Sequence, residues 1–346
     1  MKAEILLTKH PLLGSKNKSI SSYLDNYFEI ATHINIATGF ISNESIVTLR
    51  QLIEYRANQL SVNLFIGMNY IDGFTQLQYE AVKDLASYLK ENNLGDVYVS
   101  PKALYHGKMY SFLKHDECLG SFLGSSNLSS FMGTTSDMVE VDAYFHAKEG
   151  ENINKAIVHI TNKLGEPINQ AQPVETFKEP PYSLLDNCEH VKKLNPEELS
   201  QYLKLESEPI IRIPLKTHPK SNLNTYFGKG KVPGRFSRRN YYEVEFIIPK
   251  RTPNIELLPG KTDGNFTVIT KDGFKFECSR QGDYSKNFRS AYDLSILGKW
   301  IKEKMEKCGA LKIGELVTDE SLKKFGKSHI TLTPSKDKSF WILGLE

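Results

Sequence analysis

The residues of this chain best suited to chemistry on a phosphate are a histidine and a lysine two positions apart. Tyr105 to Met109 reads Y-H-G-K-M. On a strand, His106 and Lys108 would point to the same face, because side chains alternate along a strand. An imidazole can attack phosphorus while a neighbouring ammonium holds a phosphate oxygen. We therefore predict a phosphate-directed site at this tripeptide.

Three more residues are expected to complete this site. The stretch G-S-S-N-L-S begins at Gly124, and it offers Ser125 and Asn127. The Asn127 amide can donate a hydrogen bond to the same phosphate, and Gly124 permits a close approach of the substrate. Glu140, in the V-E-V-D of the next predicted strand, would orient the His106 imidazole and fix its tautomer. The predicted catalytic set is His106, Lys108, Ser125, Asn127 and Glu140.

The elements that must hold these side chains follow an alternating pattern. Short apolar runs over 34–41 and 62–68, and a V-Y-V run from Val97, predict buried strands. Helical spacing of apolar residues follows the first two, over 44–60 and 77–89. This order is typical of a mostly parallel sheet covered by helices, so we expect an α/β first domain over residues 1–170.

The rest of the chain has a different pattern of apolar and turn residues. A Pro-rich stretch opens an expected linker over 171–208, which includes a short helix capped by Asn195 with Pro196 in its first turn. From 209 to 346 short β-type runs alternate with turns, and one long helix is predicted over 291–308. We expect a β-barrel-like second domain with one or two helices.

The charge of the chain is divided unequally. The net charge is +3, but from Ile210 onward 26 Lys and Arg face 15 Asp and Glu, which gives +11 and leaves −8 for the remainder. A cationic second half suggests a polyanionic partner, most commonly nucleic acid. Solvated lysines on exposed helix faces remain the alternative. We expect a cytoplasmic protein, since the first residues show no export signal and no apolar run approaches a membrane span.

The cysteines and histidines give no sign of a metal site. The four cysteines are widely spaced and form no C-x2-C pair, and none of the nine histidines stands in a metal-ligand spacing. We expect no disulfide framework, no metal site and no cofactor.

Together, the H-x-K at His106 and the G-S-x-N at Gly124 resemble the signature of the phospholipase D superfamily. The preceding I-A-T-G-F-I-S looks like the corresponding early strand of its nuclease members, and the resemblance covers roughly the first 165 residues. The superfamily usually has an aspartate five residues after the lysine, where this chain has Leu113. This difference fits a nuclease better than a lipid-transferring enzyme.

The resemblance implies a mechanism with two histidines. One forms a phosphohistidine and the other protonates the leaving oxygen. Since this chain has one H-x-K, two copies must meet, which implies a homodimer with one composite site. Lys108 and Asn127 of each copy would stabilise the charged transition state, so the chemistry is expected to be metal-independent.

Two polar segments of the basic half are candidates for reading DNA. They combine cations with Gln, Asn, Asp and aromatic residues, and such a mixture suits base edges as well as phosphates. The first lies between Tyr226 and Tyr242 and the second between Ser279 and Arg289; the predicted contact residues are Lys229, Lys231, Arg235, Arg238, Arg239, Arg280, Gln281, Asp283, Tyr284, Lys286, Asn287 and Arg289.

Two such loops on a β-barrel-like domain resemble the pseudobarrel DNA-binding domain of plant transcription factors and several restriction enzymes. The whole chain looks like a phospholipase D-superfamily restriction endonuclease of the BfiI and NgoFVII kind. This resemblance implies a site-specific endonuclease acting on double-stranded DNA, with a cognate DNA methyltransferase in the same system. The alternatives are a non-specific nuclease or phosphodiesterase, a lipid phosphodiesterase, an enzyme acting on RNA, and an inactive DNA-binding protein.

Overall fold

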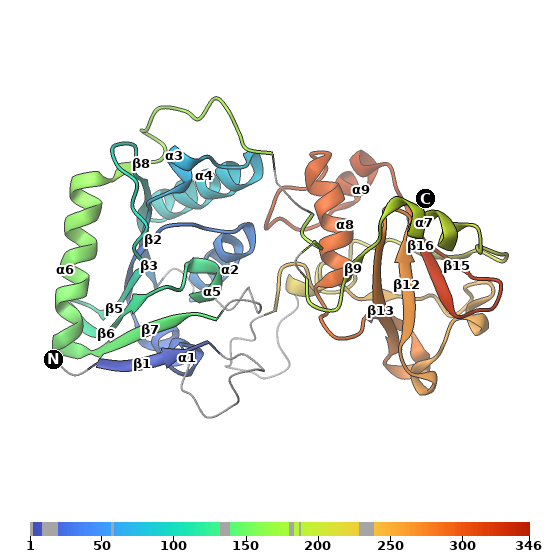
Figure 1. The fold of residues 1–346 in the computed structure, drawn as a ribbon. Coiled ribbons are helices and arrows are strands. Elements are labelled where there is room, and N and C mark those ends of the chain that lie inside the picture. The colour runs from blue at the N-terminus through green and yellow to red at the C-terminus, as the bar shows by residue number, and fades with distance from the viewer. Residues whose placement is uncertain are drawn as a thin grey trace. The chain divides into compact units, whose positions relative to one another are not determined.

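The chain forms two compact units in the computed structural model, Met1–Pro180 and Pro181–Glu346. The structure describes residues 3–8, 20–56, 59–131, 139–179, 183–186, 188–227 and 239–346. Each unit contains one large sheet, and each is described by itself (Figure 1).

Unit 1 is built on a mixed sheet of eight strands in the order β1-β7-β6-β5-β2-β3-β4-β8. Only β2, β3 and β4 run parallel to one another, and the other pairs are antiparallel. The strands are β1 (Ala3–Leu7), β2 (His33–Thr38), β3 (Ser61–Ile66), β4 (Gly95–Val99), β5 (Met109–Lys114), β6 (Glu117–Gly124), β7 (Val141–His146) and β8 (Glu166–Pro167). The expected α/β fold is confirmed, with more antiparallel pairing than the strand and helix alternation suggested.

Helices cover both faces of this sheet. The helix α6 packs across β2, β5, β6 and β7, while α2 and α4 lie on the opposite side (Figure 1). The helices are α1 (Ser21–Ile30), α2 (Asn43–Tyr55), α3 (Asn69–Asp72), α4 (Gln76–Glu91), α5 (Leu128–Phe131) and α6 (Ala147–Leu164). The two helices that follow the parallel strands start at side-chain caps, Ser42 for α2 and Thr75 for α4.

Unit 2 is a nearly closed, barrel-like sheet in the order β10-β15-β16-β12-β13-β14-β11. Its strands are β9 (Lys192–Lys193), which pairs with β13, β10 (Ile211–Pro214), β11 (Phe246–Ile247), β12 (Phe266–Thr270), β13 (Phe274–Gln281), β14 (Asn287–Ser290), β15 (His329–Pro334) and β16 (Phe340–Leu345). The helices are α7 (Pro196–Leu203), α8 (Ile296–Lys307) and α9 (Asp319–Phe325), with short 3-10 turns at Thr225–Phe227, Ile255–Leu257, Lys261–Asp263 and Asp283–Ser285. The expected barrel-like class with few helices is confirmed.

The segment expected as a linker, 171–208, is divided between the units. Asn195 caps α7 and Pro196 begins it, as predicted from the sequence. Leu199 and Leu203 of α7 pack against Ile269 and Phe340 of the barrel. This part of the segment therefore belongs to the packed body of unit 2.

Helix α8 starts later than the sequence indicates and supports the core of unit 2. It begins at Ile296 rather than at Ala291, because β14 continues to Ser290 and a short turn intervenes. Trp300, Ile301 and Met305 of α8 are buried in the same cluster as Trp341 of β16. None of the helices in the described residues is long and apolar enough to cross a membrane.

One lysine of α8 is buried in this core. The Lys302 side chain is fully inaccessible, and its Nζ donates a hydrogen bond to the Tyr241 carbonyl oxygen at 2.6 Å. It also lies 4.0 Å from the centre of the Tyr241 ring. Burial lowers the pKa of Lys302 to about 7, although the nearby Glu306 acts in the opposite direction. The folded chain thus binds fewer protons than the unfolded chain between pH 7 and the ordinary lysine pKa of about 10.4.

Because the unfolded state holds more protons in this range, the free energy of unfolding of unit 2 is expected to rise between about pH 7 and pH 10. Lys302→Met should flatten this rise, whereas the exposed Lys312→Met should leave it unchanged. Denaturant unfolding followed by tryptophan fluorescence measures this directly, since both tryptophans of the chain, Trp300 and Trp341, lie in unit 2. Equal pH slopes for the wild type and Lys302→Met would contradict the assignment.

Candidate active site and DNA interface

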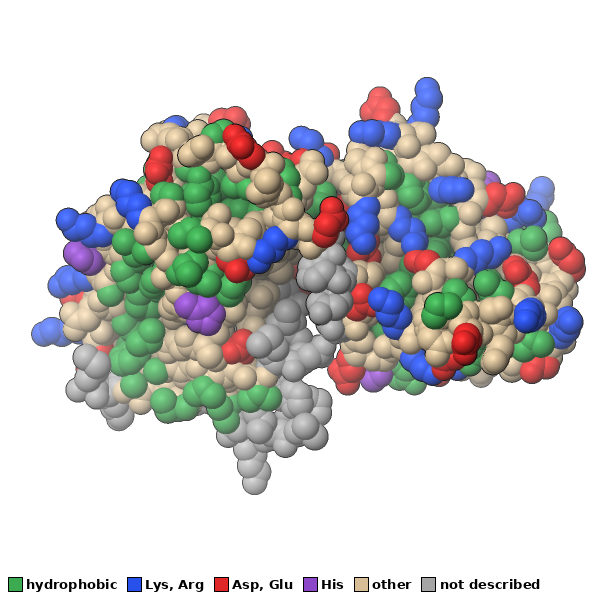
Figure 2. Space-filling view, turned by 45° about the horizontal axis from the view of Figure 1, so that its top comes forward, with side chains coloured by type: hydrophobic (Ala, Val, Ile, Leu, Met, Phe, Trp, Pro, Cys, Tyr) green, Lys and Arg blue, Asp and Glu red, His purple; other side chains and the backbone are tan. Residues whose placement is uncertain are grey.

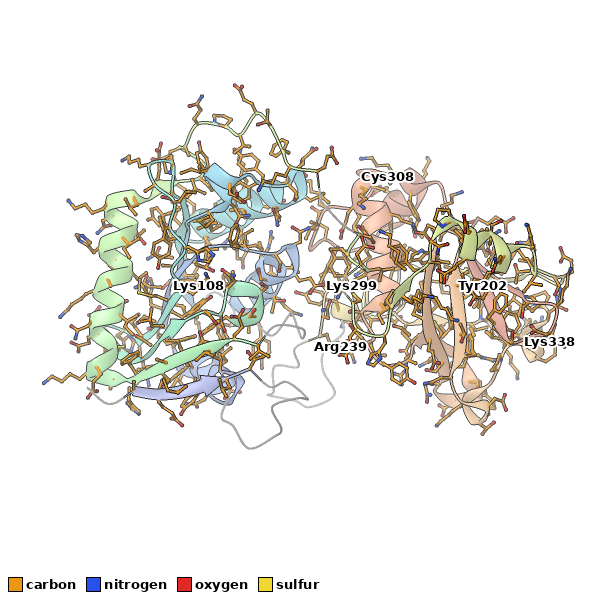
Figure 3. All side chains as sticks on the ribbon, viewed as in Figure 1. Lys108, Tyr202, Arg239, Lys299, Cys308 and Lys338 are labelled. Carbon is orange, nitrogen blue, oxygen red and sulfur yellow. The ribbon has the colours of Figure 1, made fainter. Side chains whose placement is uncertain are left out.

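The H-x-K tripeptide lies immediately before β5. The strand begins at Met109, so the tripeptide that was expected to lie on a strand precedes it, but the Gly124 amide still donates to the Lys108 carbonyl oxygen at 3.1 Å and extends the β5 and β6 pairing. His106 is exposed and Lys108 is only 5% exposed. The Lys108 Nζ lies 2.7 Å from the His106 carbonyl oxygen and 3.1 Å from the His106 Nδ1. The Lys108 ammonium and the His106 ring therefore meet although neither residue lies in the strand; Figure 3 labels Lys108 within unit 1.

The turn after β2 brings Asn127 to the same place. The Phe40 amide donates to the Asn127 Oδ1 at 3.1 Å, and the Phe40 ring packs edge-on against the His106 ring at 5.7 Å between centres. A Cβ on Gly39 would lie 3.4 Å from the His106 Cα and 3.5 Å from the Asn127 Oδ1. Since the amide oxygen of Asn127 is occupied by Phe40, its NH₂ group is left to donate to a substrate.

Gly39 and Phe40 are site residues that the sequence analysis did not single out. Both belong to the I-A-T-G-F-I-S stretch that carried the family resemblance. The signal was the glycine and aromatic residue at the end of a buried strand. Only the pairing of β2 with β5 shows that this strand end lies beside His106.

Glu140 is 4% exposed and immediately precedes β7. Its carboxylate accepts hydrogen bonds from the hydroxyls of Ser125 and of Ser130, the latter at 3.0 Å. The Val141 amide in turn donates to the Ser125 Oγ at 3.0 Å. Among the described residues of one protomer, the hydrogen bonds of this carboxylate thus go to serines and not to His106. We predicted that Glu140 orients His106, but among these described residues no hydrogen bond joins the two side chains directly.

Burial sets the electrostatics of this site. Desolvation lowers the pKa of Lys108, and the negative charge of Glu140 partly offsets that effect. An ammonium that has lost most of its water interacts more strongly with a phosphate oxygen than an exposed one does. The described residues contain no group of three or more His, Cys, Asp or Glu placed to hold a metal ion.

The first predicted DNA-reading segment is described only at its end. Lys229, Lys231, Arg235 and Arg238 lie outside the described residues. Arg239, labelled in Figure 3, donates from Nη1 to the Thr225 carbonyl oxygen at 3.3 Å and lies 3.7 Å from the Glu243 carboxylate.

The second segment forms the hairpin between β13 and β14, and strand alternation divides its residues between two faces. Arg280 is turned inward and is 8% exposed. Its guanidinium donates to the carbonyl oxygens of Ser285 at 2.8 Å, Leu258 at 2.7 Å and Ile255 at 3.2 Å. Burial lowers the pKa of Arg280. Arg280 therefore holds the turn in shape and is buried by it, which corrects its placement among the base-reading residues.

The other predicted contact residues of the hairpin are exposed or half-buried. Asp283 and Lys286 are exposed, and the Tyr284 ring at the tip is 96% exposed. Tyr284 and Ser285 both have left-handed backbones, with φ of 58° and 52°. The bonds from Arg280, together with the Lys261 amide donating to the Ser285 Oγ at 2.9 Å, fix this conformation. Gln281, Asn287 and Arg289 are half-buried on the outer face of the strands.

The excess positive charge of unit 2 is dispersed on the face that Figure 2 shows. Lys and Arg side chains alternate there with Asp and Glu side chains. On this face the structural argument for a DNA interface therefore comes from the hairpin geometry.

Each of the two units matches a known protein-family model. The family model of the NgoFVII restriction endonuclease N-terminal PLD domain matches residues 18–171, and that of the NgoFVII C-terminal B3-like DNA-binding domain matches residues 201–336. No curated protein matches the chain.

Among solved structures, the chain is similar to NucT from Helicobacter pylori (14% identity, 46% of this chain and 95% of that one, TM-score 0.30). It is also similar to the phospholipase D family member Nuc from Salmonella typhimurium (11% identity, 48% and 98%, TM-score 0.33). The two family models cover most of the chain in the order of the two units. The chain therefore belongs to the NgoFVII restriction endonuclease family, with a phospholipase D-like nuclease domain followed by a B3-like DNA-binding domain.

Proposed function

We propose that this nuclease cuts double-stranded DNA at specific sites through a phosphohistidine intermediate, in a composite site shared by two copies of the chain. The observation that carries the proposal is the convergence of His106, Lys108 and Asn127 around the Gly39 and Phe40 turn. This arrangement sets a nucleophile beside two hydrogen-bond donors suited to phosphate oxygens.

In the proposed first step, His106 attacks phosphorus, a P–N bond forms and the P–O bond to the leaving strand breaks. His106 of the partner subunit gives its proton to the leaving oxygen. In the second step that same imidazole takes a proton from water, whose oxygen attacks phosphorus and breaks the P–N bond. Lys108 and Asn127 donate to the non-bridging oxygens throughout, so we propose that neither metal nor another cofactor is required.

We assign Glu140 a supporting role. Its bonds to Ser125 and Ser130 fix the start of β7 against the G-S-x-N stretch that carries Asn127. Its charge also favours the protonated form of Lys108. Glu140 thus acts on the phosphate through Lys108, and Ser125 acts by holding Glu140.

The proposed homodimer has a candidate surface in unit 1. Exposed apolar side chains gather on the strands that flank the site: Ile5 of β1 (64% exposed), Leu123 of β6 (42%), Val141 of β7 (49%) and the preceding Val139 (51%). The strand registers place Ile5 and Leu123 opposite the same residue, Ala143. Because Val139 and Val141 adjoin Glu140, a partner covering this patch would lie close to the catalytic residues.

Unit 2 would supply the site specificity. A specific nuclease in a cell endangers the cell's own DNA, so we also propose a cognate DNA methyltransferase in the same system and a cytoplasmic location. Separate cutting and reading units further imply cleavage displaced from the recognised bases.

The first test is digestion of plasmid DNA by the purified full chain in excess EDTA. Wild type is expected to give discrete fragments, and His106→Ala should lose at least about a thousandfold in rate, because the nucleophile and the general acid are both removed. A smear from the wild type would contradict site specificity. Loss of all cleavage in EDTA with recovery in Mg²⁺ would contradict the metal-independent step.

The second test mixes subunits. With free exchange, an equal mixture of wild type and His106→Ala contains about one quarter wild-type dimers, so the rate should fall to about one quarter of that of wild type at the same total concentration. Independent sites would give about one half instead. The same mixture assayed before exchange is the control.

The third test uses the pH profile. Cleavage should decline at alkaline pH as Lys108 loses its proton, and Glu140→Gln should move this decline to lower pH, since removal of the negative charge lowers the pKa of Lys108 further. Ser130→Ala removes a bond to the same carboxylate but keeps its charge, so it should leave the alkaline limb in place. An unmoved limb in Glu140→Gln would assign Glu140 a purely structural role.

A further inference from the structure

Two glutamates that precede the edge strand β11 of unit 2, Glu243 and Glu245, stand beside two of the predicted DNA-reading arginines. In the register of the sheet, Phe246 lies opposite Phe288 and both are buried. Glu245 precedes Phe246 and Arg289 follows Phe288. In the same antiparallel register these two residues are therefore neighbours on the outer face of the sheet. Arg289 in turn lies opposite Ser279 of β13. The outer face of β11, β14 and β13 thus carries a row of polar side chains.

Glu245 binds two side chains of β14 through a single oxygen. The Asn287 Nδ2 donates to the Glu245 Oε1 at 2.8 Å, and the Arg289 Nη1 lies 3.9 Å from the same atom. The carboxylate side chain is 27% exposed and the guanidinium side chain 33%. Glu245 is therefore fixed by Asn287 and leaves part of Arg289 accessible.

Glu243 repeats the arrangement two residues earlier. Its Oε1 lies 3.7 Å from the Arg239 Nη1, which also donates to the Thr225 carbonyl oxygen. Glu243 and Arg239 are both partly exposed, at 18% and 27%. Glu243 and Glu245 lie on either side of the buried Val244, and the charges of Arg239, Glu245 and Arg289 all act on Glu243, so the two pairs lie near one another.

The hydrogen-bonding capacity of Arg289 is not filled by the protein. Its buried Nε has no partner among the described residues, and neither does the buried Oδ1 of Asn287. A guanidinium has five N–H donors in a fixed fork, and an unfilled buried donor costs free energy. This Nε is itself inaccessible, so a ligand of Arg289 would meet the outer part of the side chain, which is 33% exposed.

The paired carboxylates indicate which part of DNA these arginines meet. An arginine and a glutamate side by side have little net charge as a pair, so the pair attracts a phosphate weakly, yet the outward N–H groups of the arginine can still donate to a base edge. Guanine offers the O6 and N7 acceptors that fit this fork. We propose that Glu243 and Glu245 are positioning residues that hold Arg239 and Arg289 for base reading, with Arg289 directed to a guanine. This inference rests on the proposed recognition of a DNA sequence by unit 2.

The test selects duplexes from a random library with the full-length His106→Ala protein, which binds without cutting. This protein should enrich one consensus. Adding Glu245→Gln or Arg289→Ala should lower the preference for guanine roughly fivefold or more at the same single position, because a bidentate contact is worth about 1–3 kcal/mol. Glu277→Gln removes a carboxylate from the same sheet face on β13, and it should keep the full consensus. Glu245→Gln is isosteric and retains an oxygen for Asn287, and its thermal unfolding should match that of Glu277→Gln.

Other results would overturn the inference. If Glu245→Gln binds all duplexes more tightly with the consensus intact, Glu245 is only a repelling charge. If Arg289→Ala weakens every sequence equally and reduces the salt dependence by about one phosphate contact, Arg289 binds the backbone. If the His106→Ala protein enriches no consensus, unit 2 does not recognise a specific sequence, and the inference fails with the proposed function. In that case the wild-type digest should also give a smear instead of discrete fragments.

Discussion

The hydrogen bond from the Phe40 amide to the Asn127 side chain is the contact on which the catalytic arrangement depends. It joins the turn after β2 to the G-S-x-N stretch after β6, two segments that are 87 residues apart in the chain. It also fixes which end of the Asn127 amide faces the substrate, while the Phe40 ring limits the position of the His106 imidazole. The sheet makes this possible, because the antiparallel pairing of β2 with β5 brings the end of one strand beside the start of the other.

The residues of the proposed catalytic site differ in their exposure to solvent. His106 is accessible to a substrate, whereas Lys108 and Glu140 are withdrawn behind it. A buried ammonium next to a buried carboxylate would be costly if either group lacked partners. Here Lys108 is bonded to the His106 carbonyl oxygen, and Glu140 is bonded to two serine hydroxyls. The site thus holds a desolvated cation for the phosphate without leaving an uncompensated charge in the sheet.

In unit 2, the alternation of side chains along the strands separates supporting residues from residues that could contact DNA. Neighbouring residues of β13 serve opposite purposes, since Arg280 faces inward and binds three carbonyl oxygens while Gln281 faces outward. The inward arginine keeps a turn with two left-handed residues in a fixed shape, and this turn presents the Tyr284 ring to the surroundings. The outward arginine, Arg289, is held by a carboxylate from the adjacent edge of the sheet. Rigid support on one face and partly unfilled donors on the other are what a surface needs to read base edges.

The sequence by itself determined the class of chemistry, the two-part organisation and the segments concerned. His106, Lys108 and Asn127 were identifiable because their spacing is a local pattern, and the α7 cap at Asn195 was identifiable because capping involves only neighbouring residues. Tertiary structure decided the rest. The serine partners of Glu140, the place of Phe40 beside His106, the inward turn of Arg280 and the pairing of Glu245 with Arg289 all depend on strand registers. A register is set by long-range packing of buried faces, and one residue of shift would send each of these side chains to the opposite side of its sheet.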